Sequence, residues 1–442
     1  MNRVDSTQRL PHLTAIDTNM WPGVGSVPPV APSSFRARRA EARFARAAQR
    51  AQLLLSSEEP DLVIEHELLF SRIAASGWIG LAESYLAGEW DAAPPQELTR
   101  VLRALLAVGY RPKTARLTAE TVHTAPGALP ASLVAHYAGD ATSSFQGHFS
   151  TGVPTRQRIA LKSGVRGAGR GDEPVQYYVD HTDIGAPIHA RRGDLADAQQ
   201  HSIEMALDAA GVRFGSHLLV YPAAGASLPV AAVQRGASVD CVCLDAPTES
   251  DLRERLILAG VDDAVRLISQ GGGQRGTGFD VRGSYDAIVS MEYLETEPTK
   301  DKIRFLRELG ALLAPGGRIS LQTIVSTEEL SGAARAALTS LRAYAWPGLS
   351  YVVLDELAQK VDRHTGLRVI ARSSAPEHLV ASLRLQRETF ASHLREAAAD
   401  GYDVVYRRLW NWQFALREAL AQLSMIDLVQ VTLQPRSRQG RR

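Results

Sequence analysis

Residues 215–245 follow a strand, turn, helix, strand pattern that limits the possible fold more than any other part of the chain. His217 to Tyr221 and Ser238 to Leu244 are short apolar runs typical of buried strands, and Leu228 to Gln234 can form the helix between them. This arrangement predicts the first unit of a doubly wound parallel sheet, in which a nucleotide-like ligand lies at the end of the first strand. The turn from Pro222 to Ala226 reads Pro-Ala-Ala-Gly-Ala, whereas such turns are usually rich in glycine.

Strands and helices continue to alternate along the rest of the chain. We expect further strands at 265–269, 285–291, 318–324 and 427–433, and helices at 194–210, 248–259, 299–313, 382–399 and 403–423. This alternation predicts an α/β fold with a mostly parallel sheet that is covered by helices on both faces.

The composition is that of a folded, soluble protein without a strong bias of charge. Of the 442 residues, 45% are hydrophobic and 22% are charged, and the formal net charge is +1. We expect no nucleic-acid partner, because the overall positive charge that favours such binding is missing. No apolar run reaches the roughly 18 residues of a membrane span, and Met1 to Leu10 lacks an apolar signal core, so we expect a cytoplasmic protein.

Two cysteines, Cys241 and Cys243, lie two positions apart on one expected strand, so their side chains point to the same face. A Cys-x-Cys pair alone makes no structural zinc site, because such a site takes four ligands. We expect buried, reduced thiols and no metal site.

Changes in composition divide the chain into five parts. We expect an irregular N-terminal segment (1–34), an N-terminal module (35–109), a variable connecting segment with little periodic pattern (110–193), the main domain (194–434) and a basic tail (435–442).

An arginine-rich helix is expected at residues 35–55, at the start of the N-terminal module. It is either a solvated surface helix or a helix attracted to an anionic lipid surface. Its six arginines do not all fall on one face, which favours the first interpretation. They are Arg36, Arg38, Arg39, Arg43, Arg46 and Arg50.

Seven stretches together resemble the cyclopropane-fatty-acyl-phospholipid synthase family of S-adenosylmethionine (SAM)-dependent methyltransferases. Their order and spacing, rather than any single stretch, carry the resemblance, which excludes roughly residues 110–190. The stretches are Gly80 to Trp90, Tyr285 to Glu295, Leu313 to Ile324, Tyr344 to Gly348, His378 with Leu383 to Leu385, Arg408 to Trp410, and Ile426 to Leu433.

The resemblance implies a class I methyltransferase fold, which is Rossmann-like with a mostly parallel seven-stranded sheet, and a small N-terminal α+β module on the lipid side. It implies transfer of a methylene or methyl group from SAM to a cis double bond of a phospholipid acyl chain, with bicarbonate as the second cofactor. The expected partners are phospholipid or fatty-acyl chains at the membrane surface. A cytoplasmic protein of this kind would be peripheral to the inner face of the membrane.

The resemblance also assigns candidate catalytic residues. Glu295 matches the family glutamate that holds the bicarbonate, Gln322 and Ile324 match two strand positions beside that ion, and His378 completes the candidate set. The family cysteine and tyrosine of this site have no counterpart, and the tyrosine position falls on Gln413.

Candidate cofactor-binding residues follow the first two strands of the main domain. They are Tyr221, Ala223 and Gly225 in the turn, and Asp245, which could accept ribose hydroxyls.

The turn also departs from the family. The acidic residue that would hold the SAM ammonium group falls on Val220, and the three motif glycines fall on Pro222, Ala224 and Ala226. Side chains there occupy the space that glycine leaves for the cofactor.

Three functions remain open at the level of the sequence. The chain is an active fatty-acyl methyltransferase with an atypical SAM site, a non-catalytic homologue that acts as the partner of an active paralogous methyltransferase, or a protein with another small-molecule ligand. The residues favour impaired or lost catalysis, because scaffold motifs persist where site motifs have changed.

Overall fold

A computed structural model describes residues 10–55, 59–93, 97–112, 129–170, 173–223, 225–269 and 281–436. The chain forms two compact units. Unit 1 consists of Met1–Ala125, Glu329–Pro347 and Leu394–Met425, and unit 2 consists of Pro126–Glu328, Gly348–His393 and Ile426–Arg442. These divisions differ from the sequence-based ranges, because two later stretches of the chain join the N-terminal residues in unit 1.

Unit 2 is built on one sheet, which has nine strands within the described residues, in the order β3-β4-β10-β11-β9-β8-β5-β6-β7. The pairs from β9 through β7 are parallel, whereas β11 runs antiparallel to both β9 and β10. The predicted mostly parallel α/β sheet is therefore confirmed. The strands are β3 (Thr155–Lys162), β4 (Gln176–Asp183), β5 (His217–Val220), β6 (Ser238–Cys243), β7 (Val265–Ser269), β8 (Tyr285–Met291), β9 (Leu313–Ser326), β10 (Leu367–Ser374) and β11 (Ile426–Pro435).

The sheet is two strands wider than the seven predicted. The strands β3 and β4 form an antiparallel hairpin, and β4 extends the sheet by pairing in parallel with β10. Both come from the segment that was expected to be a connection. Most side chains of β3 are exposed because it is an edge strand, so it lacks the apolar pattern by which buried strands are found.

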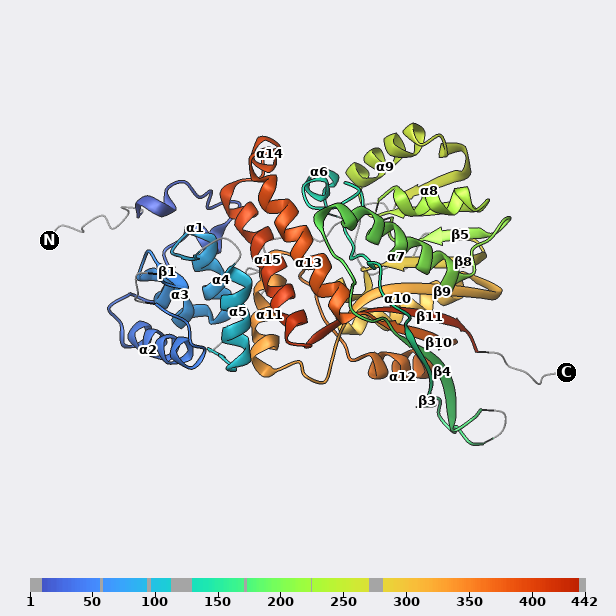
Figure 1. The fold of residues 1–442 in the computed structure, drawn as a ribbon, viewed down its shortest axis with the longest axis horizontal. Coiled ribbons are helices and arrows are strands. Elements are labelled where there is room, and N and C mark those ends of the chain that lie inside the picture. The colour runs from blue at the N-terminus through green and yellow to red at the C-terminus, as the bar shows by residue number, and fades with distance from the viewer. Residues whose placement is uncertain are drawn as a thin grey trace. The chain divides into compact units, whose positions relative to one another are not determined.

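Helices cover both faces of the sheet (Figure 1). Helices α7, α8 and α9 pack on one face through an apolar cluster that includes Leu207, Leu228 and Leu252, and α10 and α12 pack on the other through Leu306 and Leu357. The helices of unit 2 are α6 (Ala131–Ala135), α7 (Leu195–Ala210), α8 (Ser227–Gln234), α9 (Ala246–Leu258), α10 (Thr299–Ala311), α12 (Leu354–His364) and α13 (Pro376–Ser392), with 3-10 helices at Arg192–Asp194, Asp262–Ala264 and Leu294–Thr296.

The two cysteines lie side by side in the apolar cluster under α8. Cys241 and Cys243 are buried on β6 and form no disulfide. Burial raises the pKa of both thiols, that of Cys243 to about 12. The prediction of buried thiols is confirmed.

Where the structure describes it, unit 1 consists of helices and loops apart from a two-stranded antiparallel sheet. Its helix α15 carries Trp412, which is fully buried and donates from its indole N–H to Ser340 Oγ at 3.0 Å on α11. Gly80 allows α4 to approach α3, because a Cβ at this position would lie 2.0 Å from the carbonyl oxygen of Arg72. The elements are α1 (Pro22–Gly25), α2 (Phe35–Arg50), β1 (Leu62–Ile64), α3 (Leu68–Ser76), α4 (Trp78–Leu86), β2 (Trp90–Ala92), α5 (Glu97–Ala107), α11 (Gly332–Tyr344), α14 (Leu394–Ala399) and α15 (Val404–Gln422), with a 3-10 helix at Pro11–Leu13.

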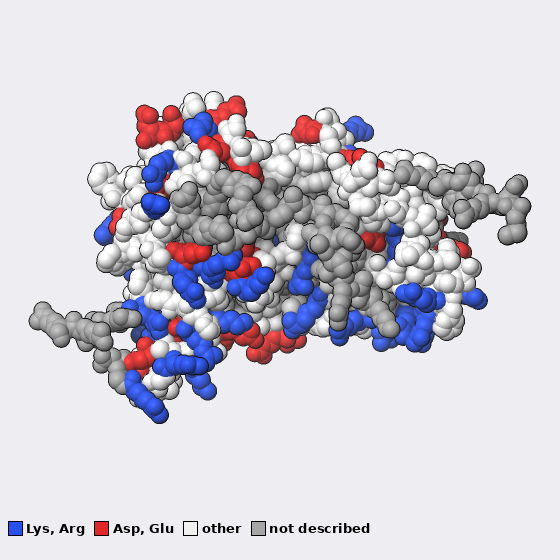
Figure 2. Space-filling model, turned by 180° about the vertical axis from the view of Figure 1, so that it is seen from behind, with Lys and Arg blue, Asp and Glu red and all other residues white. Residues whose placement is uncertain are grey.

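The arginine-rich helix predicted at 35–55 is α2, which ends at Arg50. Its side chains Ala37, Ala40, Phe44, Ala47 and Ala48 are buried. Lys and Arg side chains gather over this part of unit 1, at the lower right in Figure 2. In the part of the chain that the structure describes, no helix is both long and apolar enough to span a bilayer.

Candidate functional site

The sheet of unit 2 has a topological switch point between β5 and β8. The chain runs from β5 outward to β6 and β7, and then returns to β8 on the opposite side of β5. In open α/β sheets, ligands bind outside the carboxyl ends of the strands at such a point. The candidate site is therefore lined by the residues that follow β5, β6 and β8.

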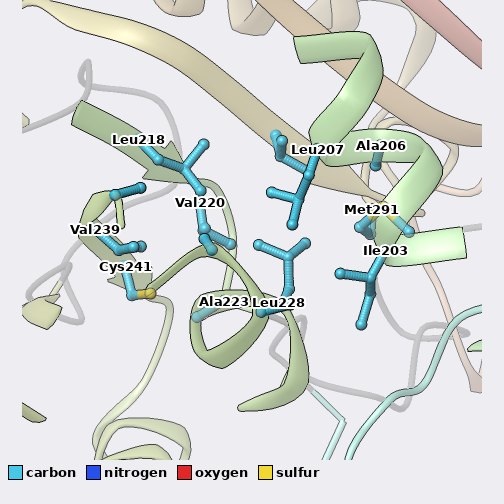
Figure 3. Packing of buried hydrophobic residues seen from close by; sticks show 14 of the residues in the cluster. Ile203, Ala206, Leu207, Leu218, Val220, Ala223, Leu228, Val239, Cys241 and Met291 are labelled. Carbon is cyan, nitrogen blue, oxygen red and sulfur yellow. The ribbon is translucent and has the colours of Figure 1, made fainter. Parts of the chain in front are cut away.

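The turn after β5 is packed into the protein. The ring of Tyr221 lies against Tyr293 and Phe305, with ring centroids 5.7 and 5.4 Å apart. The Ala223 amide donates to the carbonyl of Val242 at 2.8 Å, and its methyl group is buried. Figure 3 shows Ala223 beside Leu228 in the same apolar cluster, below Val220. Ala224 lies outside the described residues.

A segment that precedes the sheet core covers this turn. Gly225 has a φ of +120°, and a Cβ built on it would lie 2.3 Å from the carbonyl oxygen of Thr142. The backbone of the Asp140–Ser143 segment therefore already fills the open side of the turn. Gly225 is required here both for its backbone conformation and for this close approach.

Asp140 fixes this segment to the first turn of α8. Its Oδ2 accepts hydrogen bonds from the hydroxyls of Thr142, Ser143 and Ser227, each at 2.7 Å, and its Oδ1 accepts from the amides of Thr142 and Ser143. Burial would raise the pKa of Asp140, but the hydrogen bonds outweigh burial and lower it. The ionised carboxylate thus joins residues that are 87 positions apart in sequence.

A second carboxylate lies at the carboxyl end of β8. Glu292 has a φ of +46°, which is unusual for a residue with a side chain. Its Oε1 accepts from the amide of Gln146 at 2.6 Å and from Nε2 of Gln322 at 3.1 Å. Gln322 Nε2 also donates to the carbonyl of Gln146, and Gln322 Oε1 accepts from Gln430 at 3.0 Å. These contacts hold the segment around Gln146 across the end of β8.

The predicted catalytic residues Glu295 and Gln322 do not contact each other and have different hydrogen-bond partners. Glu295 is 3% exposed, and its Oε2 accepts from Thr323 Oγ1 at 2.7 Å. Gln322 precedes Thr323 on β9, and successive side chains of a strand point to opposite faces. Gln322 and the buried Ile324 therefore face α7, whereas Thr323 and its bonded Glu295 lie on the other side.

His378, the fourth predicted catalytic residue, connects two backbone segments. Its Nδ1 accepts from the amide of Phe149 and its Nε2 donates to the carbonyl of Gly185, both at 2.9 Å. The ring is fully buried. Burial is the largest influence on its pKa and lowers it, so this histidine is neutral and is held by the main chain.

Asp245 stands at the carboxyl end of β6, where the sequence predicts a ribose contact. Its Oδ1 accepts from the amide of Thr248 at 2.8 Å and caps the N-terminus of α9. Residues 270–280, which follow β7, lie outside the described residues. Within the described ranges, no group of three or more His, Cys, Asp or Glu side chains is arranged to hold a metal ion.

The residues present do not fit the methionine part of SAM. At the end of β5, the position for an acidic side chain is Val220, which is 2% exposed in an apolar cluster. Ala223 and Ala226 are buried, and the Thr142 carbonyl already contacts Gly225.

The residues that form this site were mostly not predicted from the sequence. Asp140, Gln146 and Ser227 lie in stretches without a strong periodic pattern, and only the Asp-x-Thr-Ser sequence indicated a hydrogen-bonded turn. Glu292 had a clearer signal, because it directly follows the apolar strand that ends at Met291.

Comparison with known proteins gives a family and a relative of similar length. Residues 186–431 match the mycolic acid cyclopropane synthetase family. Tuberculostearic acid methyltransferase UfaA1 of Mycobacterium tuberculosis (strain ATCC 25618 / H37Rv) is 30% identical over 437 residues, which cover 95% of this chain and 96% of that protein.

A solved structure shows the same fold at low sequence identity. Coclaurine N-methyltransferase, bound to N-methylheliamine and S-adenosylhomocysteine (SAH), has a TM-score of 0.54 at 12% identity, with coverage of 80% of this chain and 98% of that chain. The cyclopropane synthase MmaA2 from Mycobacterium tuberculosis has a TM-score of 0.48 at 22% identity, with coverage of 54% and 85%.

These findings confirm the family resemblance and the class I methyltransferase fold that the motifs predict. The family match covers more than half of the chain, and the relative is similar over nearly all of it. This chain belongs to the mycolic acid cyclopropane synthetase family.

Proposed function

We propose that this chain is a non-catalytic member of its family, which keeps the methyltransferase scaffold for binding and has lost methyl transfer from SAM. Its role is then that of a partner for an active paralogous methyltransferase that works on phospholipid acyl chains. The proposal concerns the site alone, because the scaffold itself is that of an enzyme family.

One observation carries the proposal. The turn after β5 holds the buried Pro222 and Ala226 where the cofactor needs glycine, and the Thr142 carbonyl is already in contact with Gly225. Four hydrogen bonds from Thr142 and Ser143 to the Asp140 carboxylate fix the shape of that segment. Ser227 bonds both the carboxylate and the Thr142 hydroxyl, so moving the segment away from the turn would break these two contacts with α8.

The second carboxylate supports the same conclusion. Glu292 and Gln322 both form hydrogen bonds with the backbone of Gln146 and with each other. A ligand would have to replace these contacts in order to bind either side chain. The residues expected to hold bicarbonate are also separated. Glu295 is bonded to Thr323 on one face of β9, whereas Gln322 points to the other face.

An active fatty-acyl methyltransferase with an atypical SAM site is the alternative. Two observations favour it: Glu295 is retained and buried, and Asp245 still stands at the end of β6. The relative named as a tuberculostearic acid methyltransferase is also similar over nearly its full length.

Lipid analysis separates the two functions. The chain is expressed, alone, in a bacterial host that makes unsaturated phospholipids, and cells are fed methionine with an isotopically labelled methyl group. The Mycobacterium tuberculosis tuberculostearic acid methyltransferase, expressed in the same way, is the positive control. We expect labelled acyl chains from the control and none from this chain.

Labelled cyclopropane or methyl-branched chains made by this protein would support the alternative. The variant Glu295→Gln then decides whether the activity belongs to the predicted site, because it removes the carboxylate and keeps the shape of the side chain. Co-purification of an active paralogue with the tagged chain from its native cell tests the partner role.

A further inference from the structure

The solvent side of α2 carries a row of arginines. Five of its six arginines recur at intervals of three and four residues, which places them along one side of the helix. All are exposed, and Arg38 lies off the row. The row consists of Arg36, Arg39, Arg43, Arg46 and Arg50.

The ends of the row have a structural role. Arg36 Nη2 donates to the carbonyl of Ala74 near the end of α3, and Arg50 Nη2 donates to the carbonyl of Val108 just after α5, both at 3.0 Å. These two arginines satisfy carbonyls at helix C-termini, which is a common use of cations. They therefore do not argue for a ligand.

The three arginines in the middle of the row do not have a comparable structural role. Within the residues that the structure describes, none of Arg39, Arg43 and Arg46 forms an ion pair with a carboxylate, and the recorded bond of Arg46 is to the carbonyl of Ala42 in its own helix. Like charges three and four residues apart destabilise a helix. An external anionic surface would remove this repulsion.

An exposed aromatic ring extends the row. Phe35 is 75% exposed and lies four residues before Arg39, on the same side of the helix. A helix with cations and an aromatic side chain on one exposed surface suits the boundary between phosphate headgroups and acyl chains. A duplex nucleic acid would neutralise the same charges but would leave the ring in water.

We propose that this face of α2 binds the surface of an anionic phospholipid bilayer. Phosphates lie against Arg39, Arg43 and Arg46, and Phe35 enters the headgroup layer. The arginine face lies outside residues 186–431, which match the family, and the proposal holds whether or not the site in unit 2 binds SAM.

The expected effect follows from the electrostatics of such surfaces. Each arginine near an anionic leaflet strengthens partitioning by roughly a factor of five, and the attraction is screened by salt. Replacing three arginines should therefore weaken binding on the order of 100-fold at low ionic strength.

The test uses the full-length protein and vesicles made of equal parts of phosphatidylglycerol and phosphatidylcholine, with pure phosphatidylcholine vesicles for comparison. The variant is Arg39→Gln, Arg43→Gln and Arg46→Gln combined. The control, Arg213→Gln, Arg253→Gln and Arg304→Gln combined, changes the net charge equally at exposed positions of unit 2.

We expect the wild type and the control to sediment with anionic vesicles and not with neutral ones, and the α2 variant to lose this binding. Its thermal midpoint should stay the same or rise, because like-charge repulsion is relieved. Phe35→Ala should weaken binding several-fold without changing its dependence on salt. Equal binding by the α2 variant and the wild type, or a preference for duplex DNA or single-stranded RNA over vesicles at equal phosphate concentration, would overturn the proposal.

Discussion

Gly225→Ala tests whether the Asp140–Ser143 segment really closes the turn after β5. The new methyl group would lie 2.3 Å from the Thr142 carbonyl oxygen, and the residue would keep a φ of +120°. A backbone conformation of this kind costs about 1–3 kcal/mol for a residue other than glycine. Displacing a packed backbone segment adds about 1–3 kcal/mol.

Together these terms predict that Gly225→Ala destabilises unit 2 by roughly 2–6 kcal/mol. The matched control is Gly211→Ala, also in unit 2. Gly211 has a φ of +75° at the end of α7, but a Cβ there meets nothing within 4 Å. The control should therefore cost only the backbone term, about 1–2 kcal/mol.

A double-mutant cycle with Asp140→Ala isolates the contact. Without its carboxylate, the segment can move away from the turn, so the cost of Gly225→Ala should fall by about 1–2 kcal/mol in that background. The cost of Gly211→Ala should not change.

Urea unfolding followed by far-UV circular dichroism measures these free energies, and hydrogen exchange of peptides from 217–234 localises them. All six tryptophans belong to unit 1, so indole fluorescence reports that unit separately. Additive costs for Gly225→Ala and Asp140→Ala, within about 0.5 kcal/mol, would refute the packing described here.

Three further predictions concern stability. Burial raises the pKa of Asp427 from 3.8 to about 6. The protonated side chain therefore contributes fully to the free energy of unfolding below pH 3.8, and this contribution is lost as the pH rises through about 6. Between pH 4 and pH 7 the wild type should lose roughly 3 kcal/mol of unfolding free energy from this group, and Asp427→Asn should not; urea unfolding at the two pH values measures the difference. Arg72→Met leaves the fully buried Glu89 carboxylate without its guanidinium partner at 2.8 Å, so we expect a loss of about 3–5 kcal/mol at pH 8. The loss of stability should shrink toward pH 6, because burial raises the pKa of Glu89 to about 7 and the neutral acid needs no counter-charge. Urea unfolding followed by tryptophan fluorescence measures this loss. A loss that does not change with pH would contradict the prediction. Phe44→Ala should lower the stability of unit 1 by about 3–5 kcal/mol, because this fully buried ring joins α2 to α3, and an unchanged fluorescence midpoint would show that α2 is not packed there.

Buried parallel strands could be predicted from the sequence almost residue by residue. The strands β7 and β8 have the predicted boundaries, because both are mostly apolar runs between clear breaks. β8 is buried over nearly its whole length, whereas β7 is an edge strand in which only Val265 is buried. The edge strand β3 was missed, since its side chains are mostly solvated. The alanine-rich α11 was also missed, because small side chains give only a weak apolar stripe.

Of the candidate site, only the unusual turn after the first strand of the main domain could be predicted from the sequence. The unusual turn at Pro222–Ala226 was recognised from its missing glycines, whereas what covers it was not. Asp140 meets Ser227, and Gln146 meets Glu292, only after the chain has folded over the switch point. Neither local propensity nor periodicity contains such a pairing between distant residues.

Calorimetric titration of the full-length protein with SAM and with SAH tests the central claim most directly. Coclaurine N-methyltransferase, whose structure contains SAH, serves as the positive control. Because the turn after β5 holds the buried Pro222 and Ala226 at glycine positions and is covered by the Thr142 carbonyl, we predict no heat of binding up to millimolar ligand. Saturable binding in the micromolar range would contradict the account.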